Sequence, residues 1–212
     1  KLAVIQRAVT ALEKIYSLID VDEAISEGQA RWPESFRALH LESIHFGYRD
    51  GPQVLTDISF SVRQNEVVAI CGRTGSGKST VGKLIARAYE GYEGVIRVDE
   101  VDLCSLALDS LHDAIGVVHQ DVQLYPGDVR FNLTLGRAID DKTLNQAIDM
   151  ARAREVVTRL GGLDGLIEHH GANLSVGERQ LLSFARTMAH DPQIIILDEA
   201  TASVDTLTEA AI

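Results

Sequence analysis

Residues 67–80 read VVAICGRTGSGKST, and this stretch decides the fold. Val67 to Cys71 form a continuous apolar run with the length of a buried strand. The glycines that follow predict a tight loop, and the residues from Lys78 onward read as a helix. A buried strand followed by a glycine-rich loop and a helix indicates an α/β fold built on a parallel sheet.

The loop from Gly72 to Ser79 matches the pattern G-x-x-x-x-G-K-[ST] at every fixed position, in the context that the pattern requires. Backbone amides and the positive end of a helix are suited to phosphate oxygens, which predicts a bound nucleoside triphosphate. Lys78 should reach the β- and γ-phosphates, and the Ser79 hydroxyl should bind Mg²⁺. A glycine-rich turn that matches by chance is the alternative, which the flanking strand and helix disfavour. The expected binding residues are Gly72, Thr74, Gly75, Ser76, Gly77, Lys78, Ser79 and Thr80.

Asp198 and Glu199 follow a second apolar run, Ile194 to Leu197, which is the strongest candidate for a buried strand. Ligands of parallel sheets bind beyond the carboxyl ends of the strands, where these carboxylates would lie. Asp198 fits a residue that holds Mg²⁺ through water, and Glu199 fits one that orients and polarises the attacking water. Alone, the pair would read as a solvated strand end. Together with the phosphate loop, it predicts hydrolysis of the nucleotide.

The rest of the chain surrounds these motifs with alternating strands and helices. Residues 1–20 have helical spacing, and residues 20–35 read as a polar linker. A long helical stretch between two strands implies a helical insertion. Strands are predicted at 39–41, 58–62, 95–98 and 115–118, and helices at 141–160 and 176–189.

The composition limits the classes of function. Apolar residues make up 45% of the 212 residues, enough for one sizeable core. The formal net charge of -11 opposes binding to a nucleic-acid backbone. No apolar run approaches the roughly 18 to 20 residues that span a bilayer. Cys71 and Cys104 lack metal-type spacing and are expected to be buried thiols.

Residues 173–180, NLSVGERQ, resemble the signature motif of the ATP-binding cassette (ABC) family, usually written LSGGQ. The resemblance covers about residues 36–212, and the motifs stand in the family's order, with residues 202–205 resembling its D-loop. It implies an α/β fold: a P-loop NTPase core with a mostly parallel sheet, an N-terminal antiparallel β edge and an α-helical insertion subdomain. The implied core is about 36–125 and 191–212, and the implied helical subdomain is about 126–190.

The resemblance also implies roles for single residues. Tyr48 would stack on adenine, which identifies the nucleotide as ATP. The expected cofactors are therefore ATP and the Mg²⁺ that accompanies its phosphates. Ser175 and Gly177 would bind the γ-phosphate of ATP held by an opposite subunit, so a working site would need two chains. The implied catalytic residues are Glu199, Gln120 and Lys78, and the implied metal ligands are Ser79, Gln120 and Asp198.

Three residues depart from the family's pattern. Val176 replaces a glycine of the signature, Glu178 replaces its glutamine, and Asn65 replaces a common glycine before the phosphate loop. The signature is therefore bulkier and more acidic than usual, next to a triphosphate. Ser175 and Gly177 are kept, which favours a tuned site over an inactive one.

Two further segments resemble those of exporters. The helix from Ala8 to Asp20 resembles the tail that joins transmembrane helices to the cassette, and Glu168 to Gly171 resembles the loop that touches the membrane domains, with Glu168 in the contact. The implied partners are a second nucleotide-binding domain, in a homodimer or heterodimer, and a transmembrane domain. The implied location is the cytoplasmic face of the cell (inner) membrane. Residues 1–35 would link to a missing membrane domain, and we expect the cassette's C-terminal part, including its switch histidine, beyond Ile212.

The function that these observations favour is an ATP-binding and ATP-hydrolysing domain that powers export across a membrane as a nucleotide-sandwiched dimer. The alternatives are a non-transport ABC ATPase of the DNA-repair or chromosome type, which the acidic charge disfavours, and a silent regulatory module, which Glu199 and Gln120 disfavour. His169 and His170 are interpreted as surface residues and not as metal ligands. Arg152, Arg154 and Arg159 are interpreted as a solvated face of the helical insertion.

Overall fold

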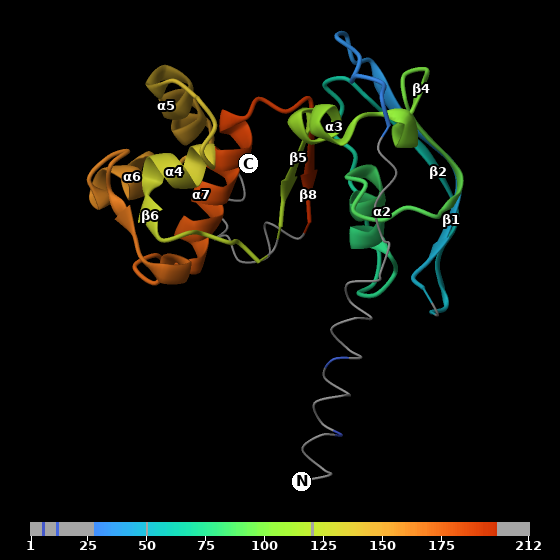
Figure 1. The fold of residues 1–212 in the computed structure, drawn as a ribbon, viewed down its shortest axis with the longest axis horizontal. Helices are drawn as coiled ribbons and strands as arrows, with labels where there is room; N and C mark the ends of the chain where they lie inside the picture. Colours follow the sequence, from blue (N-terminus) through green and yellow to red (C-terminus); the bar gives the residue numbers. More distant parts are fainter. Residues whose placement is uncertain (1–5, 7–11, 13–27, 50, 120, 199–212) are drawn as a thin grey trace.

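The computed structural model describes residues 6, 12, 28–49, 51–119 and 121–198. Figure 1 shows two lobes, one of strands with short helices and one of helices, with a pair of strands between them. The predicted opening helix lies outside the described residues, except for Gln6 and Leu12, which are helical. Within the described ranges, none of the helices combines the length and apolar character that crossing a bilayer requires.

The strand lobe is built on an antiparallel sheet with the strand order β2-β1-β3-β4. Its inner face buries alternate residues such as Leu39, Leu41 and Ile96, as expected for a sheet with one side on the core. This sheet confirms the predicted antiparallel edge. The strands are β1 (Ala38–Gly47), β2 (Gln53–Arg63), β3 (Glu93–Val98) and β4 (Val101–Asp102).

Helices cover this sheet and lead to the parallel pair. The helix after the phosphate loop is α2 (Lys78–Ile85), and η1 (Leu103–Ser105) and α3 (Leu108–Ala114) follow β4. Next, β5 (Ile115–Val118) pairs in parallel with β8 (Ile194–Leu197), from Ile115 opposite Ile194 to Val118 opposite Leu197. The carboxyl ends of both strands therefore lie at one edge, as the sequence predicts.

Two strand predictions need correction. Val67 to Cys71 are all described and form no strand: Val67 is 95% exposed, and Cys71 is exposed instead of being a buried thiol. The predicted buried strand β8 is only half-buried, with Leu197 46% exposed. Both segments are more exposed than predicted because few of the described residues cover them. Among the described residues β8 pairs only with β5, and an apolar run becomes a buried strand only when neighbours cover it.

The helical lobe packs four helices around one apolar core. Its central residues include Leu133, Leu144, Ile148 and Leu182, all fully buried. Asp128 and Asp140 cap two of the helices by accepting hydrogen bonds from backbone amides of their first turns. The elements are β6 (Gly127–Asp128), α4 (Val129–Thr134), α5 (Asp141–Met150), α6 (Arg154–Leu160), β7 (Leu166–Ile167), η2 (His169–Gly171) and α7 (Val176–Ala189).

The predicted helix 141–160 is in fact two helices. The break lies between α5 and α6, where Arg152 has a φ of 57°. A residue in the left-handed region cannot continue a right-handed helix, so the chain turns there. The single apolar face that the periodicity indicated is shared by α5 and α6, which contribute Ile148 and Val157 to the same core.

Candidate nucleotide site

The phosphate loop takes a shape that strongly favours glycine at two positions. Gly75 and Gly77 have φ values of 81° and 88°. A Cβ on Gly77 would lie 2.6 Å from Leu55 Cδ2, and one on Gly72 would lie 2.7 Å from Ser76 Oγ. The loop is therefore tightly folded, and α2 begins directly after it at Lys78.

Lys78 folds back over this loop. Its Nζ donates hydrogen bonds of 3.0 Å to the carbonyl oxygens of Gly72 and Arg73. The ammonium group therefore lies among the residues that should surround the phosphates. Since carbonyl oxygens are weaker acceptors than charged phosphate oxygens, a bound triphosphate would compete for these donor hydrogens.

The structure brings Ser79 and Asp198 together. Ser79 Oγ donates a 2.6 Å hydrogen bond to Asp198 Oδ1, although 119 residues separate the two in sequence. A cavity of about 190 Å³ opens beside them, between α2, α3 and the β5–β8 pair. A hydroxyl and a carboxylate oxygen that reach an open cavity fit Mg²⁺, which prefers hard oxygen ligands and keeps water and phosphate in its remaining positions.

Tyr48 is packed against the start of α2. Its hydroxyl lies 3.0 Å from Thr80 Oγ1, and its ring meets the ring of Tyr89 edge-on, with centroids 5.1 Å apart. Thr80 is buried, so its hydroxyl serves this contact, and its expected phosphate contact stays a prediction. Tyr89 was not singled out from the sequence, where the only signal is an aromatic residue soon after α2.

The predicted signature forms the start of α7. Ser175 Oγ accepts a 3.2 Å hydrogen bond from the amide of Glu178, and the amide of Ser175 donates a 2.7 Å bond to Glu178 Oε2. This reciprocal arrangement is a capping box. A Cβ on Gly177 would meet nothing within 4 Å, so the first turn of α7 is open to solvent.

Glu178 is charged and has a second partner. The hydrogen bond from the amide of Ser175 and the nearby Arg159 guanidinium lower the pKa of its carboxyl group. Arg159 Nη2 lies 2.6 Å from Glu178 Oε1. Arg152, Arg154 and Arg159 are all exposed, as the interpretation of a solvated face predicts, but Arg159 also pairs with Glu178 and Arg154 pairs with Asp149 at 2.8 Å. Sequence spacing gave no signal for either pair.

The phosphate loop and the signature lie in different lobes. Figure 1 shows α2 in the strand lobe and α7 in the helical lobe, with β5 and β8 between them. Gln120, Glu199 and the D-loop-like residues 202–205 lie outside the described residues, so their roles stay predictions. Within the described ranges, no group of three or more histidine, cysteine or acidic residues could hold a metal, so the histidine pair 169–170 lacks companion ligands.

Comparisons with known proteins agree with these motifs. The model of the ABC transporter family matches residues 55–202. The uncharacterized ABC transporter ATP-binding protein YwjA of Bacillus subtilis is 43% identical over 176 residues, 82% of this chain and 31% of that protein. The fatty acid ABC transporter ATP-binding/permease protein of Mycobacterium tuberculosis is 37% identical over 98% of this chain and 33% of its own length. The ATP-dependent lipid A-core flippase of Coxiella burnetii is 35% identical over 97% of this chain and 36% of its own length.

A solved structure matches as well. A bacterial Atm1-family ABC exporter with ATP bound superposes with a TM-score of 0.84 and 30% identity, over 98% of this chain and 37% of that one. The chain thus spans 31–36% of the length of these curated relatives. These matches confirm the predicted fold class and the predicted family. With the family model covering most of the sequence and relatives similar along nearly all of it, this chain belongs to the ABC transporter family.

Proposed function

We propose that this chain is the ATP-hydrolysing domain of an exporter and that it works as a dimer with ATP between its two subunits. The observation that carries the proposal is the Ser79–Asp198 hydrogen bond, because it joins the phosphate loop to the end of β8. ATP-binding domains of ABC transporters are ATPases coupled to transport. The joined loop and strand end supply the groups that such hydrolysis needs.

The residues of this chain bind the phosphates, stabilise their charge and activate water. Loop amides and the start of α2 hold phosphate oxygens, and Lys78 moves from its loop carbonyls to the β- and γ-phosphates. Mg²⁺, held by Ser79, Asp198 and Gln120, supplies neutralisation of phosphate charge when bound. Glu199 orients and polarises the attacking water. Tyr48, fixed by Thr80 and Tyr89, offers its ring to adenine.

A second copy, or a related domain, completes the site. Ser175 and Gly177 lie on the helical lobe, and the phosphate loop lies on the strand lobe (Figure 1). The open first turn of α7 suits the γ-phosphate of ATP bound by the partner, because helix N-termini attract anions. One chain therefore contributes the loop of one site and the signature of the other.

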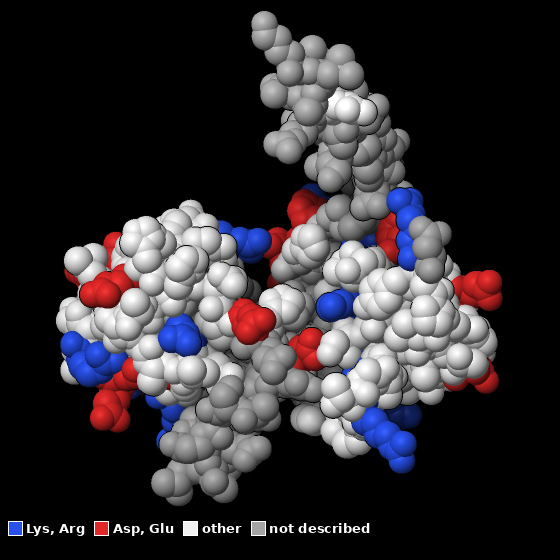
Figure 2. Space-filling model, turned by 90° about the horizontal axis from the view of Figure 1, so that it is seen from below, with Lys and Arg blue, Asp and Glu red and all other residues white. Residues whose placement is uncertain are grey.

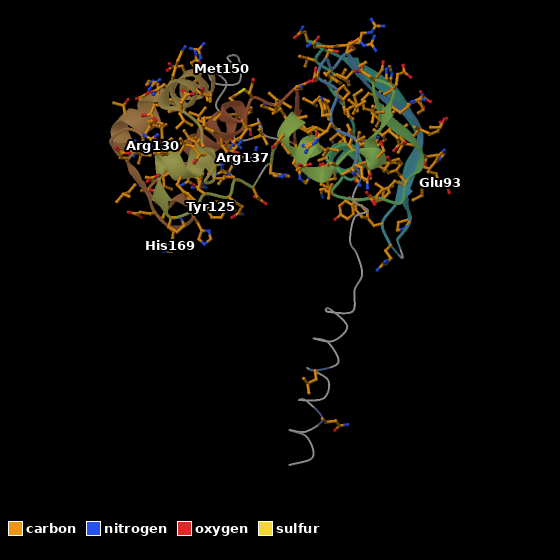
Figure 3. All side chains as sticks on the ribbon, turned by 45° about the horizontal axis from the view of Figure 1, so that its top comes forward. Glu93, Tyr125, Arg130, Arg137, Met150 and His169 are labelled. Carbon is orange, nitrogen blue, oxygen red and sulfur yellow. The ribbon has the colours of Figure 1, made fainter. Side chains whose placement is uncertain are left out.

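A transmembrane domain is the proposed second partner, at the cytoplasmic face of the cell membrane. Two observations support this. Two of the relatives, the fatty acid ABC transporter proteins of Mycobacterium bovis and Mycobacterium tuberculosis, combine ATP-binding and permease parts in one protein. Near the exporter-like segment 168–171, Tyr125, Phe131 and Leu166 are exposed, and Figure 3 shows Tyr125 and His169 toward the same end of the helical lobe. Exposed apolar side chains that gather beside a predicted contact loop favour a protein partner there.

The domain layout that we propose follows the motifs. Residues 1–35 link to the membrane domain, and residues 36–212 form the ATPase domain with its helical subdomain at about 126–190. The non-transport alternative is not favoured, because the curated relatives include a flippase and fatty acid transporters. Figure 2 shows acidic and basic side chains mixed over one face, without a continuous basic patch among its described residues for nucleic acid.

The test is Glu199→Gln in the full-length protein. The change removes the carboxylate that orients and polarises the attacking water but keeps the shape of the side chain, so ATP should bind within about twofold of wild type while hydrolysis falls by about 10² to 10⁴. Binding is measured by ATP titration, and hydrolysis by phosphate release. The exposed Glu34 offers a matched control, since Glu34→Gln should leave both values unchanged. Wild-type turnover in Glu199→Gln would contradict the proposed function.

A further inference from the structure

The two oxygens of the Glu178 carboxylate have separate partners. Oε2 accepts a 2.7 Å hydrogen bond from the amide of Ser175, and Oε1 lies 2.6 Å from Arg159 Nη2. The first contact belongs to α7, and the second joins α7 to α6 across 19 residues of sequence. The side chain is therefore fixed from two sides, within the turn that carries the signature.

The Glu178 carboxylate lies beside backbone amides of the first turn of α7 that could bind an anion. In the first turn of a helix the amides have no acceptor within the helix, and among the described residues none accepts from the amides of Val176 or Gly177. These donors suit an anion. An ionised carboxylate one or two residues away would repel a triphosphate, and like charges at this range oppose binding. The acidic signature therefore needs a compensating cation.

Arg159 is placed to supply it. Its side chain is 49% exposed and that of Glu178 is 26% exposed, so the pair is partly desolvated. The geometry points to Arg159 as a positioning residue of the signature: it neutralises Glu178 and holds it in the capping box, so that the start of α7 can accept the γ-phosphate of a partner's ATP. This inference rests on the proposed function, and it goes beyond it by assigning a residue outside every nucleotide motif.

A double-substitution cycle in the full-length protein tests this role. The variants are Arg159→Gln, Glu178→Gln and the two combined, assayed for the KM and kcat of ATP hydrolysis. Arg159→Gln should raise the KM for ATP about three- to fivefold, as expected for a partly exposed pair, and change kcat less. Glu178→Gln keeps an acceptor for the amide of Ser175 without the charge. The combined variant should therefore return to within about twofold of the wild-type KM.

The controls separate a positioning role of Arg159 from a general loss of protein stability. Arg154→Gln breaks a comparable ion pair on the same helix, with Asp149, and should leave the KM unchanged. The KM increase in Arg159→Gln should also shrink in high salt, because salt screens the uncovered carboxylate. If Arg159→Gln does not fold, Arg159→Lys keeps the charge, and its KM should stay near that of wild type.

Two results would overturn the inference. One is a wild-type KM in Arg159→Gln, which would make the contact an ordinary surface ion pair. The other is an equal KM increase with and without Glu178→Gln, which would mean that Arg159 does not act through Glu178. Neither touches the proposed function, which fails separately if wild-type protein does not hydrolyse ATP or if Glu199→Gln hydrolyses it normally.

Discussion

The two helix starts that are predicted to meet phosphate, those of α2 and α7, are built differently. Gly77 precedes α2 and makes no side-chain hydrogen bond to its first turn. Ser175 precedes α7 and forms a full capping box with Glu178. The first-turn amides of α2 thus have no side-chain acceptor from the cap, whereas α7 satisfies part of its own end. The difference suits α2 for the main phosphate contact and α7 for a narrower contact that a partner completes.

The start of α2 also carries a positively charged side chain, whereas the start of α7 carries a negatively charged one. The start of α2 carries Lys78, whose ammonium group lies over the loop. The start of α7 carries the acidic Glu178, whose charge is offset from another helix by Arg159. A phosphate is therefore attracted to α2 by its own residues. At α7, the attraction of a phosphate depends on the contact between Arg159 of α6 and Glu178 of α7.

The largest expected effect is that of Gly77→Ala. The residue has a φ of 88°, where a side chain costs about 1–2 kcal/mol, and the new Cβ would lie 3.2 Å from the backbone oxygen of Val54. The start of α2 should shift, so stability should fall by at least about that amount and ATP binding should be lost. Thermal unfolding and ATP titration of the full-length protein measure the two effects. Wild-type ATP affinity in this variant would show that the loop shape is not required.

Gly177→Ala is the matched change at the other helix start, with a smaller expected effect. The new Cβ meets nothing within 4 Å, and Gly177 has an ordinary negative φ, so the fold should be as stable as wild type or slightly more stable. The methyl group would occupy the open space that the partner's phosphate should enter. ATP hydrolysis should then fall about tenfold or more, because small displacements at a reacting group are costly. Unchanged hydrolysis would remove α7 from the composite site.

The sequence was sufficient for the motifs whose chemistry is local. Gly72 to Ser79 had to form a loop at a helix start, and Asp198 had to follow a strand, so their meeting at one edge could be predicted. The α/β class followed from the alternation of strands and helices in the same way, whereas the antiparallel edge was implied by the resemblance to the ABC family.

Burial and pairing could not be predicted, because they depend on neighbours in space. Val67 to Cys71 had the composition of a buried strand, yet its burial required covering elements that the described residues do not supply. Arg159 looked like any surface arginine of a helix. Only the packing of α6 beside the start of α7 gave it Glu178 as a partner, and no pattern along the chain encodes that contact.

The smallest expected effect is the pH dependence of the capping box. The pKa of Glu178 is lowered in the folded protein, so its contribution to stability is present above the unfolded pKa of about 4.3 and is lost as the pH falls through the folded value. Glu178→Gln should therefore lower the melting temperature at about pH 7, and the difference from wild type should shrink below about pH 4. Thermal unfolding at both pH values measures this, with the exposed Glu34→Gln as the control that should show little change at either pH. A constant difference at all pH values would mean that the charge of Glu178 does not account for its contribution to the start of α7.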